Sequence, residues 1–345
     1  MSSRQRVGIL AAALFLSLPS FRTHAQGVSA VPPPAAQAEE ADPSEISWHQ
    51  AIEAKLVEEQ FDELDRIADH LRRDKVRLPG GDWKLRKFYE ALDAPQLTDT
   101  DSVAHIAHLE HWMTARPESI TARIALATSL DRWAWVARGN GFANTVTPEG
   151  WRLFRERSGR ADTILAGAAN MHTMDPQYFA ELMTVGRAQQ WDPNRVRDAF
   201  QRGIQFEPDY IYLYKEYASY LLPKWFGQPG QSAAFAKDSA DRLGGTAGDA
   251  LYFQIATVLI KRGDGNFPVQ ELDWIRIQQG YTAVGTQFGY TSRMRNELAF
   301  IAWKYGDANV ARQQFAAIGP RWSRSVWREK QFFDRIRDWS NGHNS

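Results

Sequence analysis

Apolar residues recur every three or four positions along most of the chain after residue 46. Three such series are Phe61, Leu64, Ala68 and Leu71; Ala122, Leu126, Leu130, Trp133 and Ala137; and Trp151, Phe154, Ser158, Ala161 and Leu165. This spacing places the side chains on one face of an α-helix, whereas a half-buried strand needs strict alternation. Alternation of comparable length is absent from the sequence. The pattern predicts an all-α fold.

Proline and glycine interrupt the helical pattern at intervals typical of short connections between helices. The interruptions are Pro79-Gly80-Gly81, Asp93-Ala94-Pro95, Arg116-Pro117, Gly139-Asn140-Gly141, Gly227 to Gly230, Gly244-Gly245 and Gly263 to Asn266. Asp175-Pro176, Asp192-Pro193 and Glu207-Pro208 each place an acidic residue before a proline. An acid stabilises the positive end of the helix dipole, and proline at the first helical position lacks only a donor that would be unpaired. The three pairs therefore predict helix starts.

The helix spacing favours stacked antiparallel hairpins that resemble degenerate tetratricopeptide repeats. Two predicted helices fill the 32 residues between Pro176 and Pro208, close to the 34-residue tetratricopeptide period. A better local match lies near the C-terminus, at Leu298-Ala299, Gly306-Asp307, Ala311 and Phe315. The two alanines let helices approach closely, the glycine makes the turn, and the phenylalanine fills the gap. An irregular helical bundle is the alternative.

The first residues have the composition of a secretory signal peptide. Two arginines precede an apolar run over residues 7–21, and Thr23-His24-Ala25 ends in a small residue suited to cleavage. The run is shorter than the roughly 20 residues that span a bilayer. Residues 26–45, with Pro32-Pro33-Pro34, are too poor in large apolar groups to order and are expected to form a linker. We expect a signal peptide at 1–25, a linker at 26–45 and a helical-repeat domain at 46–340, with 46–92 considered as an N-terminal subunit.

Charge and cysteine content narrow the partners and the location. The chain has 41 basic and 41 acidic side chains, and removal of Arg4, Arg6 and Arg22 with the signal leaves a net charge of −3. Such a body has no electrostatic attraction to nucleic acid. The chain has no cysteine, so neither a disulfide nor a lipidated thiol is available. We expect a periplasmic or secreted protein without a membrane span after signal cleavage.

Several segments, taken in order, resemble a bacterial family known as domain of unknown function 4034. They are Phe61 to Leu71, Trp83-Lys84-Leu85 with Phe88-Tyr89, Trp135 to Ala143 with Trp151 and Phe154, and Leu221 to Gln231. The resemblance covers most of Phe61 to Leu243. It implies a tetratricopeptide-like helical protein, and it implies no activity, because the family has none assigned.

Two adjacent aromatic residues, Trp225 and Phe226, lie between Pro223 and Pro229 in the predicted elbow of a hairpin. Burial of each ring would be favourable by about 2 to 3 kcal/mol, so a loop that plugs the open end of the hairpin is one interpretation. A recognition loop is the other, because aromatic residues are enriched at binding surfaces. Gly139-Asn140-Gly141-Phe142 poses the same choice. The candidate binding residues are Tyr210, Tyr214, Tyr217, Trp225 and Phe226.

Metal and cofactor chemistry have weak support in the sequence. His105, His108 and His111 lie three residues apart near Glu110, whereas a zinc helix usually has histidines four apart around a glutamate. We expect one or two of them to face solvent and one to pack against Trp112. Phosphate-binding and dinucleotide-binding glycine motifs and a nucleophile elbow are absent from the sequence, and Gly263 to Asn266 has one carboxylate where a calcium loop needs several oxygens. We expect no metal and no cofactor.

Paired carboxylates remain open, because two acids that catalyse glycoside hydrolysis need not be close in sequence. Glu149, Glu207, Asp209 and Glu216 lie near the aromatic segments, but Glu149 and Glu207 suit helix starts, and Lys215-Glu216 has the appearance of a solvated helix face. The leading hypothesis is an exported, non-enzymatic interaction module that binds a peptide, protein or glycan of the cell envelope. The alternatives are an all-helical cell-wall or carbohydrate hydrolase and an assembly scaffold.

Overall fold

The computed structural model describes residues 37–38, 43–93, 99–139, 141, 143–263 and 267–342. Its α-helices are α1 (Pro43–Val57), α2 (Phe61–Asp74), α3 (Lys84–Leu92), α4 (Asp99–Ala115), α5 (Ile120–Arg138), α6 (Pro148–Ala168), α7 (Pro176–Ala188), α8 (Pro193–Phe206), α9 (Ile211–Tyr220), α10 (Gln231–Leu243), α11 (Gly245–Arg262), α12 (Trp274–Phe288), α13 (Ser292–Tyr305), α14 (Ala308–Ile318), α15 (Arg324–Trp327) and α16 (Lys330–Ser340). Three single turns of 3-10 helix are η1 (Pro79–Gly81), η2 (Ala143–Thr145) and η3 (Val269–Glu271). The two-residue strands β1 (Gln37–Ala38) and β2 (Arg321–Trp322) pair in parallel. The predicted all-α class is confirmed.

The predicted signal peptide at 1–25 lies outside the described residues, as do Ala94, Pro95, Asn140, Phe142 and 264–266 from the predicted breaks. Helix α1 begins at Pro43, inside the range predicted as linker. Helix α3, at the end of the considered subunit 46–92, packs against α5. In the part of the chain that the structure describes, no helix is both long and apolar enough to span a bilayer.

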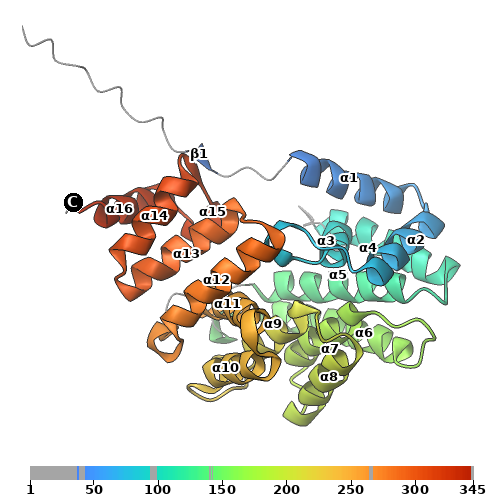
Figure 1. Ribbon diagram of the computed structural model, residues 1–345. Coiled ribbons are helices and arrows are strands. Elements are labelled where there is room, and N and C mark those ends of the chain that lie inside the picture. Colours follow the sequence, from blue (N-terminus) through green and yellow to red (C-terminus); the bar gives the residue numbers. More distant parts are fainter. Residues whose placement is uncertain are drawn as a thin grey trace, which may run out of the picture. The chain divides into compact units, whose positions relative to one another are not determined.

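The helices form two rows (Figure 1). Each odd-numbered helix from α1 to α13 contacts the next odd-numbered helix, so these helices form one continuous inner row. The even-numbered helices α2 to α14 pack onto the inner row from outside, each against at least one of its odd-numbered neighbours. Burial follows this arrangement: α7 is buried on almost every side, whereas α8 buries one stripe formed by Val196, Ala199, Phe200 and Gly203. One apolar stripe is sufficient for an outer helix, while an inner helix has neighbours on both sides.

Two of the three acid–proline pairs start helices as predicted. Asp175 and Asp192 cap α7 and α8, and each carboxylate accepts a backbone N–H two residues further on. The prediction for Glu207-Pro208 is wrong, because Glu207 ends α8 and α9 begins at Ile211. The Glu207 carboxylate instead forms an ion pair at 2.8 Å with Lys75, from the end of α2.

The hairpin predicted near the C-terminus is present as α13 and α14. Gly306 has φ of 74° and ends α13, and Asp307 caps α14. Ala299 and Ala311 are fully buried where the two helices meet, and Phe315 fills the space beside them. The roles inferred from the sequence for these residues agree with their positions.

The inner row curls back, so that the segment before α3 contacts the segment between α12 and α13. Gly80 donates its backbone N–H to the carbonyl of Gly289 at 3.1 Å. Asp82, which is 7% exposed, accepts hydrogen bonds from Tyr212 and Arg293, both at 2.8 Å. The Lys215 ammonium lies 3.8 Å from the same carboxylate. Helices α3, α9 and α13 are thereby joined through one buried carboxylate.

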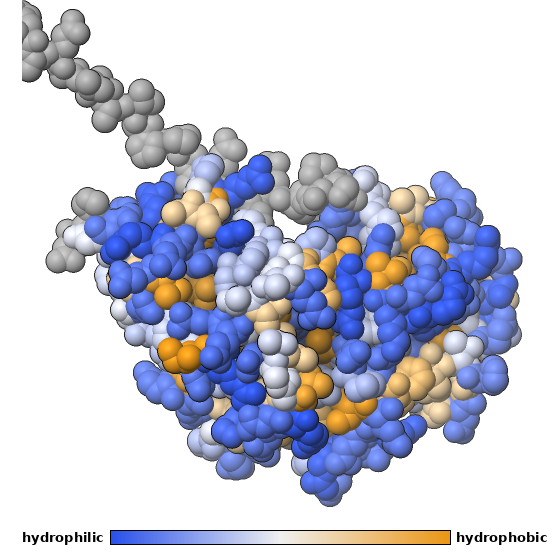
Figure 2. All heavy atoms as spheres, viewed as in Figure 1, coloured by the Kyte–Doolittle hydropathy of each residue, from blue (hydrophilic) through white to orange (hydrophobic). Residues whose placement is uncertain are grey.

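The surface carries no single dominant apolar area on the face drawn in Figure 2, where apolar residues lie in groups among polar ones. The most exposed large apolar side chains among the described residues, Val136 and Ile275, are far apart in sequence and lie on different helices. Single exposed apolar residues of this kind are normal for a folded protein. The search for a site therefore turns to the cavities.

Candidate functional site

The five aromatic residues predicted to bind a partner have different environments. Tyr210 is fully buried and donates its hydroxyl to Gln177, so it offers no surface to a ligand. Tyr214 and Tyr217 are half-buried, and both pack against Phe200. Tyr214 and Tyr217 hold α9 against α8, so the three tyrosines are weaker candidates for binding a partner than Trp225 and Phe226.

The loop between α9 and α10 combines both interpretations considered for Trp225 and Phe226. Phe226 stacks on Tyr220 with ring centroids 4.8 Å apart and closes the hairpin. Trp225 contacts Trp135 edge to face at 5.6 Å, and the Arg187 guanidinium lies 5.3 Å from its ring centroid. Trp225 therefore belongs to the lining of the inner face, and Phe226 to the packing of the loop.

Two cavities meet at Trp225. The first, here called the charged cavity, has a volume of about 300 Å³. Its lining comes mainly from the inner row and consists of Arg86, Asp93, Thr128, Asp131, Arg132, Trp135, Glu181, Thr184, Arg187, Glu216, Trp225 and Arg262. The second, here called the aromatic groove, has a volume of about 580 Å³ and shares Arg187, Trp225 and Arg262 with the first.

Helical spacing explains how the inner row lines the charged cavity. Thr128, Asp131 and Trp135 follow one another at three and four positions on α5, and Glu181, Thr184 and Arg187 do so at three on α7. Residues at these spacings share one face of a helix. Each inner helix thus places a short polar stripe toward the same space.

Glu216 forms the central ion pair of the charged cavity. Its carboxylate accepts two hydrogen bonds from Arg262, at 2.7 and 2.9 Å, and lies 3.8 Å from Arg187. Burial alone would raise the pKa of Glu216, but the charge and hydrogen bonds of Arg262 lower it to about 2. The prediction that Lys215-Glu216 forms a solvated helix face is wrong. The side chains of Lys215 and Glu216 are only 13% and 10% exposed, because α9 belongs to the inner row.

Asp131 has a different environment in the same cavity. It is 4% exposed, and burial raises the pKa of its carboxyl group to about 7 against the opposing charge of Arg187. Glu181 and Asp93 raise this pKa further. Within the described residues, Asp131 Oδ1, Trp135 Nε1 and Arg187 Nε each lack a hydrogen bond of normal geometry, although the Trp135 indole lies close enough to the Asp131 carboxylate to lower its pKa. Such buried groups are costly unless a partner binds them.

The remaining charges of the cavity are paired. Arg86 lies 3.5 Å from Glu181, which also accepts a hydrogen bond from Gln177. Asp93 pairs with Arg132, although burial still raises the pKa of Asp93 to about 6. The unsatisfied hydrogen-bonding capacity is therefore concentrated around Asp131 and Arg187.

The aromatic groove combines aromatic and cationic side chains. Its aromatic lining is Trp225, Phe300, Trp303, Trp327 and Phe332. Its cationic lining is Arg187, Lys224, Lys261, Arg262, Lys304 and Arg328, against one carboxylate, that of Glu297. The Lys304 ammonium lies 5.0 Å from the ring centroid of Trp303. Arg328 has φ of 65°, a left-handed conformation that costs energy outside glycine and is enriched at binding sites.

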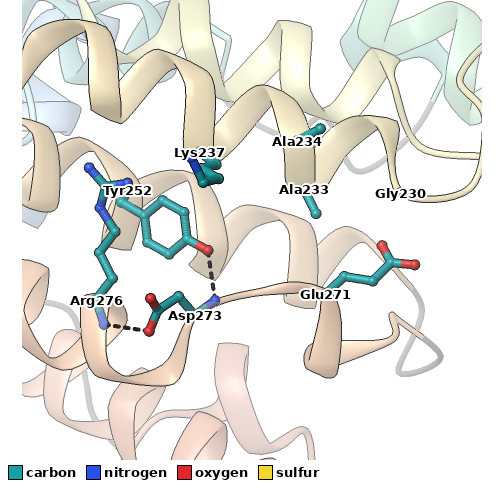
Figure 3. A pocket seen from close by; sticks show the side chains of 8 residues that line it. All are labelled: Gly230, Ala233, Ala234, Lys237, Tyr252, Glu271, Asp273 and Arg276. Carbon is teal, nitrogen blue, oxygen red and sulfur yellow. Dashed lines mark hydrogen bonds between the residues drawn. The ribbon is translucent and has the colours of Figure 1, made fainter.

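A third cavity, of about 390 Å³, lies between α10, α11 and α12 and is shown in Figure 3. The backbone N–H of Asp273 donates to the Tyr252 hydroxyl at 2.8 Å, and the Asp273 carboxylate accepts the backbone N–H of Arg276 at 3.0 Å. Lys237 pairs with Asp241 on the same outer helix. These polar groups stabilise the start of α12, so this cavity has weaker features of a binding site.

The histidines and the other candidate carboxylates lie apart from the two joined cavities. His105 is buried, with Nε2 2.8 Å from the carbonyl of Leu92, and His111 contacts Glu59 near the surface. The described residues include no group of three potential metal ligands. Glu149 is paired with Arg152 on an exposed face, and Asp209 is also exposed.

Family comparison covers the N-terminal half of the helical body. Residues 49–188 match the family described as Domain of unknown function (DUF4034). This match confirms the predicted resemblance. The DUF4034 segment runs from α1 to the end of α7, so the motif Leu221 to Gln231 lies beyond it. Asp131, Trp135 and Arg187 lie within the DUF4034 segment. No curated protein and no solved structure matches the chain.

Proposed function

We propose that the protein is a helical interaction module that binds an acidic peptide in the aromatic groove. The observation that carries this proposal is the composition of the groove, in which six cationic side chains and five aromatic ones face one carboxylate. Cations attract carboxylates, and aromatic faces bury apolar side chains between them. A ligand that alternates acidic and apolar groups fits both features.

The position of the groove on the inner face supports binding rather than packing. Stacked helical repeats present extended concave surfaces, and ligands of such proteins contact several repeats at once. Here residues from α7, α11, α13 and α15 line one groove. With the secretory signal expected at residues 1–25, the ligand would be a peptide segment of the cell envelope.

The proposal is tested with a fluorescein-labelled octapeptide of alternating glutamate and leucine. Fluorescence anisotropy should show binding, with an affinity that falls as salt rises, because exposed charges are screened. Replacement of Trp303 by alanine should weaken binding about tenfold or more, as expected for an aromatic anchor. Lys261→Gln should weaken it about threefold, within the range for an exposed ion pair.

The matched controls are a glutamine–leucine octapeptide and the variant Lys237→Gln, which neutralises a lysine beside the third cavity. The control peptide should bind the natural protein weakly. The variant Lys237→Gln should bind the acidic peptide as tightly as the natural protein does. Equal binding of the two peptides would refute the proposal. If an acidic oligosaccharide of uronic acids binds more tightly than the peptide, the ligand of the groove is a glycan.

The hydrolase alternative has one observation in its favour. Asp131 and Glu216 line the same cavity, and their environments move their pKa values apart, to about 7 and about 2. Such a separation is typical of acid and base pairs in catalysis. The bidentate ion pair with Arg262 engages Glu216, however, and leaves it poorly placed to attack a substrate. Release of reducing sugar from peptidoglycan or polysaccharide, lost in Glu216→Gln, would favour the hydrolase.

A further inference from the structure

The charged cavity has three buried polar atoms that form no hydrogen bond of normal geometry in the described structure, although the Trp135 indole lies close to the Asp131 carboxylate. Two are donors, Arg187 Nε and Trp135 Nε1, and one is the carboxylate atom Asp131 Oδ1. All three residues line the same space of about 300 Å³, which shares Arg187, Trp225 and Arg262 with the aromatic groove. A buried polar group without a partner costs free energy, so this space is suited to a ligand group that completes the hydrogen bonds.

The charge of the aromatic groove indicates which ligand group that is. An anion is drawn into the groove by its cationic lining, and Arg187 lies where the groove meets the charged cavity. A carboxylate accepts hydrogen bonds from Arg187 Nε and Trp135 Nε1. It also repels an ionised Asp131, unless Asp131 is protonated and donates a third hydrogen bond.

Resting on the proposed function, we infer that the charged cavity binds a carboxylate of the ligand, held by Arg187, Trp135 and Asp131, and that Asp131 carries a proton in the complex. No bond between heavy atoms forms or breaks. Where Asp131 is ionised in the free protein, it takes a proton from solvent to form an O–H bond when the carboxylate enters, and it returns that proton to solvent when the ligand leaves.

The surroundings of Asp131 favour this proton. Burial has the largest effect and favours protonation, as do Glu181 from α7 and Asp93 at the end of α3, whereas Arg187 from α7 and the Trp135 indole from α5 disfavour it. The charge of Arg187 is shared with Glu216, 3.8 Å away on α9. Glu216 is in turn neutralised by Arg262 of α11, so the cavity has no cation reserved for Asp131. The entry of a further negative charge makes protonation of Asp131 still more favourable.

The experiment uses benzoate as the probe and the isosteric neutral amide benzamide as its control, with the full helical body. Isothermal titration in buffers of different ionisation enthalpy measures the protons taken up on binding. With a pKa of about 7 in the free protein, Asp131 should take up about half a proton at pH 7, about 0.9 at pH 8 and almost none at pH 5.5. Benzoate affinity should fall up to tenfold for each pH unit above 7. Benzamide should bind without proton uptake.

Two variants separate Asp131 from the rest of the cavity. Asp131→Asn keeps a hydrogen-bond donor without a titratable group, so benzoate should bind within about threefold of the natural protein at pH 6, with no proton uptake at pH 8. Arg187→Gln should weaken the binding of benzoate at least tenfold. Glu271→Gln neutralises an exposed carboxylate at the third cavity and should change neither quantity.

The outcomes distinguish this inference from the proposed function. Absence of benzoate binding at pH 6, or proton uptake that persists in Asp131→Asn, overturns the inference, even if the acidic peptide binds to the groove. Benzoate binding with proton uptake supports the inference, even if the acidic peptide fails and the proposed function falls. A C-terminally amidated octapeptide then identifies the source of the carboxylate: loss of proton uptake assigns it to the peptide terminus, and retention assigns it to a glutamate side chain.

Discussion

Replacement of Asp82 by asparagine tests how the two ends of the inner row are held together. Asp82 is almost fully buried at the start of α3 and accepts hydrogen bonds from Tyr212 of α9 and Arg293 of α13. Lys215, which is largely shielded from solvent, lies 3.8 Å away. Asparagine keeps the shape and one acceptor oxygen, but it removes the negative charge and replaces the second acceptor with an NH2 donor.

The expected loss of stability follows from the charges left behind. Removal of one partner from a buried ion pair costs about 3 to 5 kcal/mol, because the other charge stays buried without compensation. The Arg293 side chain is 43% exposed and can be solvated again, whereas that of Lys215 is 13% exposed and cannot. We therefore expect a loss of about 3 kcal/mol, at the lower end of the range.

The pH dependence of this loss has a defined sign. The positive charges of Lys215 and Arg293 hold the pKa of Asp82 well below its usual range, despite the opposing effect of burial. A carboxyl group with a lowered folded-state pKa stabilises the protein above its unfolded pKa of about 4 and loses this effect as the pH falls toward the folded value. The difference in the free energy of unfolding between the natural protein and Asp82→Asn should therefore be constant from pH 5 to 7 and shrink below pH 4.

Urea unfolding followed by circular dichroism measures both quantities. The matched control is Asp241→Asn, which removes an exposed carboxylate that also contacts two cations, Lys237 and Arg276. The control should leave the midpoint nearly unchanged, because exposed pairs contribute little. If Asp82→Asn is no more destabilising than Asp241→Asn, or if the difference between natural protein and variant grows as the pH falls, the assignment of Asp82 as the closing contact is wrong.

Four further substitutions have definite expected outcomes, all of them measurable in the same unfolding assay. Glu216→Gln removes the carboxylate that pairs with Arg187, which is 14% exposed, and with Arg262, which is 39% exposed and can be solvated again, so it should cost about 3 kcal/mol; a loss below about 1 kcal/mol would contradict the ion pair. Gly227→Ala should destabilise by at least about 2 kcal/mol, since the added Cβ would lie 1.8 Å from the carbonyl oxygen of Leu221. Gly159→Ala, with open space around the Cβ in α6, should instead stabilise by about 0.5 to 1 kcal/mol. Phe226→Ala should lower stability without affecting peptide affinity per folded molecule, as measured by anisotropy after a folded-fraction correction.

Much of the fold could be predicted from the sequence. The helical period identified the helices, and glycine and proline marked many of their ends, because these signals depend on local backbone preferences. The helix start predicted at Glu207 is wrong for a non-local reason. Its carboxylate binds Lys75, which is 132 residues away in the sequence, and local patterns carry no information about such a partner.

The candidate site was harder to predict for a related reason. Apolar periodicity separates a buried face from a polar face, but it does not say whether the polar face meets water or another helix. Lys215 and Glu216 therefore had the appearance of surface residues, although α9 is enclosed by its neighbours. The signal that could have indicated the cavity is the pair of polar stripes at helical spacing on α5 and α7, two helices that are otherwise largely apolar.

The contact between Gly80 and Gly289 has a consequence for how the chain folds. In an open solenoid each unit touches only its neighbours, and folding spreads along the chain as it is made. Here the N-terminal hairpin reaches its last partners only after more than 200 further residues have been synthesised. Closure of so long a loop raises the contact order and slows the final step. Until η1 packs against α12, the surfaces that these two segments bury against each other are exposed. Slow completion of the chain would therefore favour aggregation.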